Sequence, residues 1–182
     1  MQGVSGKGNI EKLFLESVSV KKEIIQSGCF KVLALMGGEI AKAITNGNKI
    51  MLCGNGGSAA DALHFSAELV GKFLKDREAL NVICLNANQS SLTAWSNDYC
   101  FETIFERQIE AHGQEGGVVI GISTSGKSIN VINGLKKSKN MKMKTIILTG
   151  QNIISNELVD LCINVPSLST PIIQECHLFI YH

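Results

Sequence analysis

Five short apolar runs, each of strand length, constrain the fold of this chain more than any other feature. They comprise residues 50–53, 81–85, 118–122, 145–148 and 161–165. The runs are continuous instead of alternating with polar residues, and the segments between them are long enough to hold a helix. This pattern is typical of strands that are covered on both faces. It predicts an α/β fold, with a five-stranded parallel doubly wound sheet in the flavodoxin-like order 2-1-3-4-5.

Two helices are expected before the first run. Residues 10–26 mix apolar with charged side chains, and residues 30–45 carry apolar side chains at helical spacing. Residues 1–8, which are rich in Gly, Ser and Lys, are expected to form a mobile lead-in. A chain of 182 residues with 45% hydrophobic residues suits one domain, and no linker or repeat divides it. We therefore predict a single domain over residues 9–182 that includes both N-terminal helices.

The composition excludes several classes of partner. Seventeen basic and sixteen acidic residues give a net charge of +1, without the clustered Lys and Arg that nucleic acids or anionic membranes require. No apolar segment approaches the ~20 residues of a membrane span. The six cysteines have no CxxC spacing and mostly lie in apolar runs, which indicates buried thiols of a reducing compartment. We expect a cytoplasmic protein that binds neither nucleic acid nor membrane.

Two turns rich in small residues follow the first and third apolar runs. Gly54-Asn55-Gly56-Gly57-Ser58 leads into a helical pattern, as does Ser123-Thr124-Ser125-Gly126-Lys127-Ser128. Glycine lets a backbone approach a ligand closely, and Ser58 is expected to be the N-cap of the first helix, whose free amides would face an anion. In the predicted strand order both turns flank the point where the order reverses. Either turn alone suits an ordinary connection, but together they predict a phosphate-ester site.

Polar side chains on two apolar helical patterns suggest a second part of the site. His64 and Glu68 are four residues apart and so share a helix face. An exposed ion pair is the ordinary interpretation, but their apolar neighbours indicate a packed helix. A carboxylate in such a helix requires a hydrogen-bonding or charged partner, or a functional role. The C-terminal apolar pattern also carries Gln174, Glu175, His177 and His182. Two histidines and a glutamine on such a face favour a site there.

These motifs together resemble the phosphoheptose isomerase family, a branch of the sugar isomerase (SIS) domain proteins. The resemblance runs from about residue 30 to the end of the chain. It rests on CGNGGSxxDAxHFxxEL at residues 53–69, Gly71-Lys72, Asn97-Asp98, GISTSGKS at residues 121–128 and IQECH at residues 173–177. By itself the Asn97-Asp98 pair could equally cap the helix that follows it.

The resemblance implies a homotetramer that converts D-sedoheptulose 7-phosphate into D-glycero-D-manno-heptose 7-phosphate, the first step toward the heptose of lipopolysaccharide or capsule. It also implies site residues. The substrate contacts would be Asn55, Gly56, Gly57, Ser58, Glu68, Asn97, Asp98, Ser123, Thr124, Ser125, Ser128 and Gln174. One zinc ion per subunit would be bound by His64, Glu68, Gln174 and His182, with Glu68 as the catalytic base and His182 as the acid.

The proposed zinc ligands raise a geometric problem. Gln174 and His182 are eight residues apart, which is about 12 Å along a continuous helix. We therefore expect that a neighbouring subunit supplies His182 or the Gln174 region, or else that the last helix is broken.

Two alternatives to this enzyme remain open from the sequence. One is a non-enzymatic SIS protein, either a sugar-phosphate sensor or an adaptor of the replication-initiator-associating kind. The other is an isomerase of a different ketose phosphate, because the family often has an acidic residue followed by arginine where Pro171 and Ile172 stand. The combination of His64, Glu68 and His182 favours an enzyme over a sensor.

Overall fold

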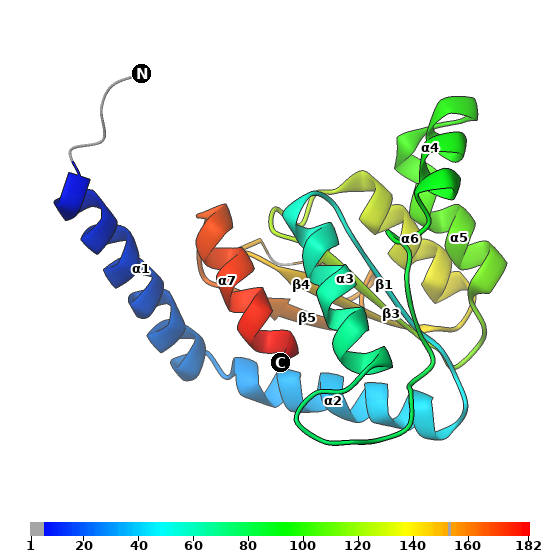
Figure 1. The fold of residues 1–182 in the computed structure, drawn as a ribbon, viewed down its shortest axis with the longest axis horizontal. Helices are drawn as coiled ribbons and strands as arrows, with labels where there is room; N and C mark the ends of the chain where they lie inside the picture. Colours follow the sequence, from blue (N-terminus) through cyan, green and yellow to red (C-terminus); the bar gives the residue numbers. More distant parts are fainter. Residues whose placement is uncertain (1–5, 153) are drawn as a thin grey trace.

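The computed structural model of the protein describes residues 6–152 and 154–182, and it contains one parallel sheet with helices on both faces (Figure 1). The strand order is β2-β1-β3-β4-β5, which confirms the predicted topology. The strands are β1 (Ile50–Gly54), β2 (Val82–Cys84), β3 (Val118–Ser123), β4 (Lys144–Thr149) and β5 (Leu161–Asn164). Their register aligns Ile50 with Val118 and Val118 with Lys144, so the three central strands start together.

Seven α-helices and one short 3₁₀ helix are found in the described residues. They are α1 (Gly6–Gln26), α2 (Cys29–Thr45), α3 (Gly57–Val70), α4 (Gln89–Asp98), η1 (Phe101–Thr103), α5 (Ile104–His112), α6 (Ile129–Asn140) and α7 (Thr170–Tyr181). Residues 6–8, expected in the lead-in, already belong to α1, and residues 1–5 lie outside the described residues.

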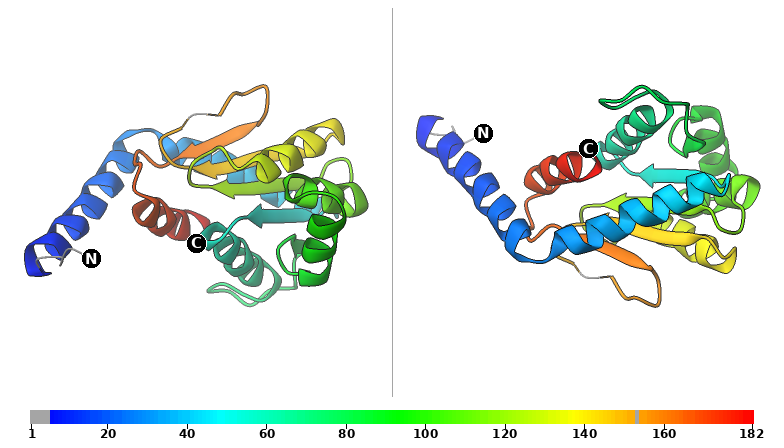
Figure 2. Two further views of the ribbon diagram at one scale, coloured as in Figure 1. Left: turned by 90° about the horizontal axis from the view of Figure 1, so that it is seen from above. Right: turned by 90° about the horizontal axis from the view of Figure 1, so that it is seen from below.

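The sheet separates two hydrophobic cores, as its continuous apolar strands require. Helices α2, α3 and α7 cover one face, where Phe65 and Ile180 pack on strand residues such as Ile120. Helices α5 and α6 cover the other face, where Phe105 and Leu135 are fully buried. The two further views in Figure 2 show the sheet between these helical layers. Every residue of β1 and β3 is buried, which explains why neither strand alternates with polar side chains.

Helix α1 extends away from the sheet and meets the body of the protein mainly at α2 and α7 (Figure 1). Ser17 donates a hydrogen bond to Glu175 on α7, and Lys21 forms an ion pair with the same carboxylate. Lys21 and Ser17 hold the pKa of Glu175 below its usual value. In the described part of the chain, no single helix has the length and apolar character of a membrane span. Helices α1 and α2 meet that criterion only as a pair, bent by 73°.

The segment before α5 excludes one interpretation of Asn97 and Asp98. The alternative in which this pair caps the following helix is not found, because both residues form the last turn of α4. Asn88 begins that helix by accepting a hydrogen bond from the Ser91 backbone N–H at 3.0 Å, so the helix continues through both residues.

The cysteines agree with the prediction of mostly buried thiols. All six are free, and four of them are buried, namely Cys29, Cys53, Cys84 and Cys176.

Candidate active site

The turns after β1 and β3 lie side by side at the carboxyl edge of the sheet. Gly54, the last residue of β1, is paired in register with Ile122 of β3. Beyond the strands, the side-chain amides of Asn55 and Asn130 exchange two hydrogen bonds, of 2.8 and 2.9 Å. These contacts bring the two turns into one crevice, which is the arrangement that the strand order predicts. We call residues 55–58 together with residues 123–128 the crevice turns.

Two asparagines that sequence reasoning missed hold the crevice turns in place. Asn86 accepts a hydrogen bond from the Gly54 N–H at 3.1 Å and donates one to the Gly54 carbonyl at 2.9 Å. Asn130 is only 2% exposed, and its side chain also accepts a bond from the Val131 N–H. The sequence does carry a signal for both residues. Asn86 is a polar residue just after a buried strand, and Asn130 is one in the first turn of an otherwise apolar helix.

The serine-rich turn after β3 is preorganised by its own hydroxyls. Ser123 donates to the Ser128 hydroxyl at 2.9 Å, and Ser125 accepts from the Lys127 N–H at 3.1 Å. Gly126 takes φ = 65°, a conformation that favours glycine. Ser128 is the N-cap of α6, so the positive end of that helix dipole faces the crevice. The turn therefore offers hydroxyls and helix amides to an anion.

The glycine-rich turn after β1 begins α3 earlier than predicted. Gly56 is the N-cap, with φ = 55°, and Ser58 lies buried within the first turn, so the prediction of Ser58 as N-cap is wrong. The physical reason is that Gly56 adopts a backbone conformation that serine rarely adopts. The side chain of Gln174 from α7 packs on Gly57, where an added Cβ atom would lie 2.0 Å from the Gln174 amide nitrogen. Gln174 thus belongs to the crevice.

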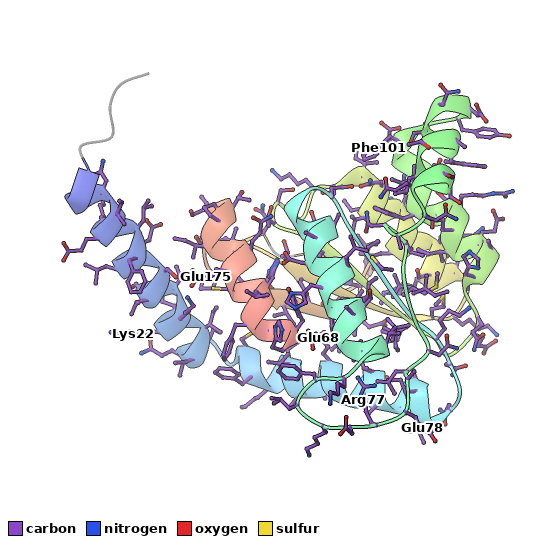
Figure 3. All side chains as sticks on the ribbon, viewed as in Figure 1. Lys22, Glu68, Arg77, Glu78, Phe101 and Glu175 are labelled. Carbon is purple, nitrogen blue, oxygen red and sulfur yellow. The ribbon has the colours of Figure 1, made fainter. Side chains whose placement is uncertain are left out.

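Helix α7 runs beside α3 in the same direction, and the ends of both helices carry the second group of polar side chains. Ligand atoms of His64, Glu68 and His182 all lie within 4.8 Å of one another. Nε2 of His64 is 3.2 Å from a Glu68 oxygen, and the rings of His64 and His182 are 4.9 Å apart. Figure 3 shows Glu68 near the end of α3, beside α7. We call these three residues the histidine cluster.

This geometry corrects part of the expectation about zinc ligands. Helix α7 is unbroken from Thr170 to Tyr181, so the prediction of a broken last helix is wrong. His182 reaches His64 and Glu68 within one chain because it lies one residue beyond that helix, beside the end of α3. Gln174 lies instead at Gly57, about 10 Å before His64 along α3. Its role as the fourth ligand stays a prediction, as does the sharing of sites between subunits.

Aromatic side chains and an acidic group surround the histidine cluster. The Tyr181 ring stacks on Phe65 at 5.2 Å, and the Phe73 ring lies 5.1 Å from that of His182. Burial and the neighbouring carboxylate of Asp61 raise the pKa of Tyr181 above its usual value. Burial also raises the pKa of Asp61, although its hydrogen bond with Tyr181 opposes this. The arrangement gives Glu68 a partly desolvated setting, with 24% of its side chain exposed.

Other candidate residues lie away from these two groups. His177 is fully buried in the core, where a ring nitrogen lies 3.2 Å from the Thr149 carbonyl, so it does not join the histidine cluster. Asn97 donates a hydrogen bond to Asp98, and Asp98 lines a hollow between α4 and α5. No hydrogen bond within the described residues joins this pair to the crevice turns, so its substrate role stays a prediction.

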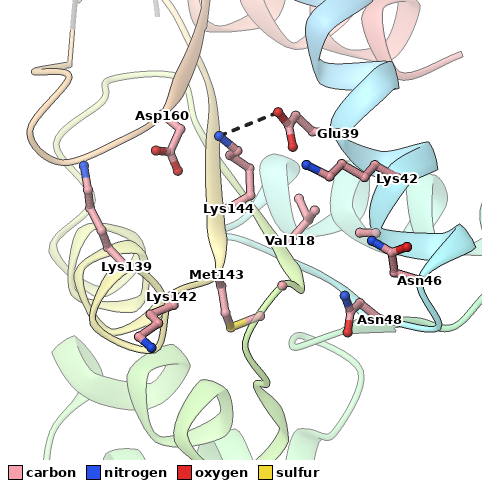
Figure 4. A pocket seen from close by; sticks show the side chains of 12 residues that line it. Glu39, Lys42, Asn46, Asn48, Val118, Lys139, Lys142, Met143, Lys144 and Asp160 are labelled. Carbon is pink, nitrogen blue, oxygen red and sulfur yellow. Dashed lines mark ion pairs between the residues drawn. The ribbon is translucent and has the colours of Figure 1, made fainter.

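A further hollow lies at the opposite edge of the sheet from the crevice turns. It has a volume of about 380 Å³, and its lining includes Lys42, Lys142, Lys144 and Glu39 (Figure 4). Lys144 and Glu39 form an ion pair at 3.7 Å across it. It contains none of the predicted site residues, and we do not regard it as the catalytic site.

Comparison with known proteins identifies the family of this chain. The SIS domain pattern matches residues 14–150. A phosphoheptose isomerase of Aquifex aeolicus is 48% identical over 174 residues, which cover 95% of this chain and 91% of the relative. This chain belongs to the phosphoheptose isomerase family of SIS domain proteins.

Two solved structures of phosphoheptose isomerases extend the similarity to the fold. The structure from Neisseria gonorrhoeae has a TM-score of 0.87 and 37% identity, and the match covers 96% of this chain and 93% of that one. The structure from Francisella tularensis has a TM-score of 0.88 and 32% identity, with the same coverage. The resemblance to this family that the sequence motifs indicate is therefore confirmed over nearly the whole chain.

Proposed function

We propose that this phosphoheptose isomerase family member converts D-sedoheptulose 7-phosphate into D-glycero-D-manno-heptose 7-phosphate. The observation that carries the proposal is the pairing of two sites along the α3–α7 contact. The crevice turns and Gln174 lie at its beginning, and the histidine cluster lies at its end. A phosphate site near a carboxylate and two imidazoles is what a sugar-phosphate isomerase needs.

The crevice turns bind the phosphate. Hydroxyl groups and the N-terminal amides of α3 and α6 suit a phosphate ester, because they supply several donors without strong net charge. Binding energy at this remote group positions the reacting carbons near Glu68 and His182. The hydrogen bonds of Asn55, Asn86 and Asn130 keep the donors oriented before the substrate arrives.

The histidine cluster carries out the proton transfers. Conversion of a ketose to an aldose moves a proton from C1 to C2 through an enediol, so it requires a base at the carbons and an acid at the oxygens. Glu68 is the base, because its carboxylate is only partly exposed and is held beside His64. His182 supplies a proton to the developing oxygen anion. The ring of Phe73 helps to exclude water from this imidazole.

Zinc fits the donor set of the histidine cluster. Two imidazoles and one carboxylate are a common set for a catalytic zinc ion, which keeps one position open. We propose that His64, Glu68 and His182 hold the ion, with Gln174 from a neighbouring subunit as the fourth ligand. When bound, zinc would polarise the sugar oxygens as a Lewis acid.

The proposed assembly is a homotetramer in the cytoplasm, with sites near subunit contacts. Apolar side chains on α1, α2 and α7 are exposed in the single chain, and a second copy could bury them. They include Ile10, Leu13, Phe14, Leu15, Phe30, Leu35 and Phe179. The six free thiols support a reducing compartment. We assign the product to the heptose of lipopolysaccharide or capsule.

A direct assay tests the function. The protein is incubated with sedoheptulose 7-phosphate, and the aldose product is measured with and without a chelator. We expect turnover by the native chain, and a loss of at least a thousandfold in kcat for Glu68→Gln, since the base is removed while its shape is kept. Glu157→Gln, an exposed acid on another segment, is the matched control and should be fully active.

The same assay separates the alternatives. Binding of the sugar phosphate without turnover by the native chain would favour the sensor or adaptor. Turnover of another ketose phosphate, but not of the heptulose, would indicate a different isomerase. Full activity of Glu68→Gln would contradict the assigned base.

A further inference from the structure

The hydroxyl group of Tyr181 lies between His64 and Asp61. Its oxygen is 3.0 Å from Nδ1 of His64 and 3.4 Å from an oxygen of Asp61. Nδ1 is the ring nitrogen that faces away from Glu68, because Nε2 is the one that approaches the Glu68 carboxylate. The three groups therefore form a continuous chain of polar contacts behind the histidine cluster.

The number of protons on these groups restricts how Asp61, Tyr181 and His64 can hydrogen-bond to one another. A neutral imidazole carries one N–H, and a phenol carries one O–H. If Nε2 of His64 offers its lone pair to a metal ion, the ring proton must be on Nδ1, and the Tyr181 oxygen is the acceptor within reach. The phenol proton then points to Asp61, since a carboxylate only accepts. A phenol is protonated near neutral pH, so Tyr181 carries the proton that this arrangement requires.

Without a metal ion the same groups favour the opposite arrangement. Nε2 of His64 lies 3.2 Å from a Glu68 oxygen, and a carboxylate at this distance favours the ring proton on Nε2. Nδ1 is then an acceptor, and Tyr181 donates its O–H to it. The imidazole carries one proton in both arrangements, and only its position differs.

We propose that Tyr181, backed by Asp61, is a positioning residue that holds Nδ1 of His64 in both arrangements: it donates to Nδ1 in the metal-free chain, and it accepts from Nδ1, with its own proton turned to Asp61, when Nε2 is a ligand. The inference rests on the proposed metal role of the histidine cluster. Contacts of this kind behind a metal-binding histidine fix its tautomer and orientation. Asp61 contributes as the acceptor at the end of the chain, and its second oxygen is buried without a hydrogen-bond partner in the described residues.

A purely packing role for Tyr181 would need only its ring. The ring stacks on Phe65 with the planes 15° apart, and a phenylalanine could retain that contact. The hydroxyl adds nothing to the stacking, but it makes the hydrogen bonds to His64 Nδ1 and Asp61. Tyr181→Phe therefore separates the two roles.

The first experiment measures zinc affinity by competition with a chromophoric chelator. We expect Tyr181→Phe to bind zinc at least tenfold more weakly than the native chain, the loss expected when such a contact is removed. Asp61→Asn should show a smaller loss, because the amide oxygen can still accept. Tyr99→Phe, which alters an exposed tyrosine stacked on Trp95, is the matched control and should bind normally. Native affinity in Tyr181→Phe, with the fold intact, would overturn the inference.

The second experiment observes by ¹H–¹⁵N NMR which ring nitrogen of His64 carries the proton. We expect the proton on Nε2 in the metal-free chain and on Nδ1 after zinc is added. In metal-free Tyr181→Phe, the Nδ1 resonance should move, because its hydrogen bond is lost, and it should stay in place in Tyr99→Phe.

The two experiments distinguish failure of the inference from failure of the proposed metal. If the native chain binds no zinc, the metal proposal fails, and the Nδ1 resonance of metal-free Tyr181→Phe still tests the contact. An unchanged Nδ1 resonance there, or a zinc-loaded His64 that retains its proton on Nε2, would refute the assignment.

Discussion

Asn55 and Asn130 exchange two side-chain hydrogen bonds, of 2.8 and 2.9 Å, and so join the turn after β1 to the start of α6. The two residues are 75 positions apart in the chain. Each side-chain amide is both donor and acceptor to the other. The polar groups of the pair are therefore hydrogen-bonded although Asn130 is buried. The spacing of the donors in the crevice turns therefore depends on a contact between two side chains that are distant in the sequence.

Replacement of Asn130 by leucine should loosen this contact. It leaves the Asn55 amide and the Val131 N–H without their partner, which costs about 1–3 kcal/mol of unfolding free energy. We expect the KM for the sugar phosphate to rise more than kcat falls, because the phosphate donors lose their alignment. Denaturant unfolding and steady-state kinetics measure the two effects. Asn140→Ala, at the exposed end of α6, should change neither, and unchanged values for Asn130→Leu would contradict the role.

Gly57→Ala should reduce activity without unfolding the protein. The added methyl group would lie 2.0 Å from the Gln174 amide nitrogen, and that amide is the mobile end of a long side chain, so it can move away. We expect a loss of at least tenfold in kcat/KM, because Gln174 leaves the crevice.

The control for Gly57→Ala is Gly37→Ala in α2, where nothing lies within 4 Å of the added group. This substitution should stabilise the protein by about 0.4–1 kcal/mol, since alanine restricts the unfolded chain. Thermal unfolding and kinetics of both variants provide the measurement. Native activity of Gly57→Ala would show that the Gln174 contact is dispensable.

His177 should make stability depend on pH. Burial lowers the pKa of His177 from 6.5 to about 4, and its hydrogen bond to the Thr149 carbonyl only partly offsets this. Between these values the unfolded chain binds a proton that the folded chain excludes, so stability is complete above pH 6.5 and is lost as the pH falls to about 4. The loss corresponds to about 3 kcal/mol.

Denaturant unfolding over this pH range, in the native chain and in His177→Gln, measures the contribution of His177. The variant should lose most of the dependence on pH, because glutamine does not titrate. His112→Gln, at an exposed position, is the control and should retain the native profile. An identical pH profile for His177→Gln would refute the prediction.

Phe14→Glu should disrupt the proposed tetramer. Phe14 is 71% exposed on α1, next to Leu13 and Leu15, which are also exposed, and a charge there cannot be buried between copies without a large cost. We expect a smaller species by light scattering, with native far-ultraviolet circular dichroism. Lys12→Glu, an exposed polar position on the same helix, should leave the assembly intact. A monomeric native chain, or a tetrameric Phe14→Glu, would contradict the proposal.

The sequence by itself determined the class of fold and indicated most of the candidate site residues. Continuous apolar runs such as Val118–Ser123 require cover on both faces, which leaves a parallel sheet with helices on each side. The glycine-rich and serine-rich turns then lie at one edge, because all carboxyl ends of a parallel sheet lie together. Local sequence patterns are enough to predict the sheet and its turns, since both depend on burial and backbone freedom at each position.

Only the tertiary structure decided how distant residues meet. The packing of α7 beside α3 places Gln174 on Gly57 and brings His182 to His64, although helix length alone separates Gln174 from His182 by about 12 Å. The structure also shows that His177 is buried in the core. It shows that Asn86, Asn130 and Tyr181 form hydrogen bonds with residues of the candidate site. Spacing along one helix cannot show which side chains face another helix, because that depends on how the two helices pack in space.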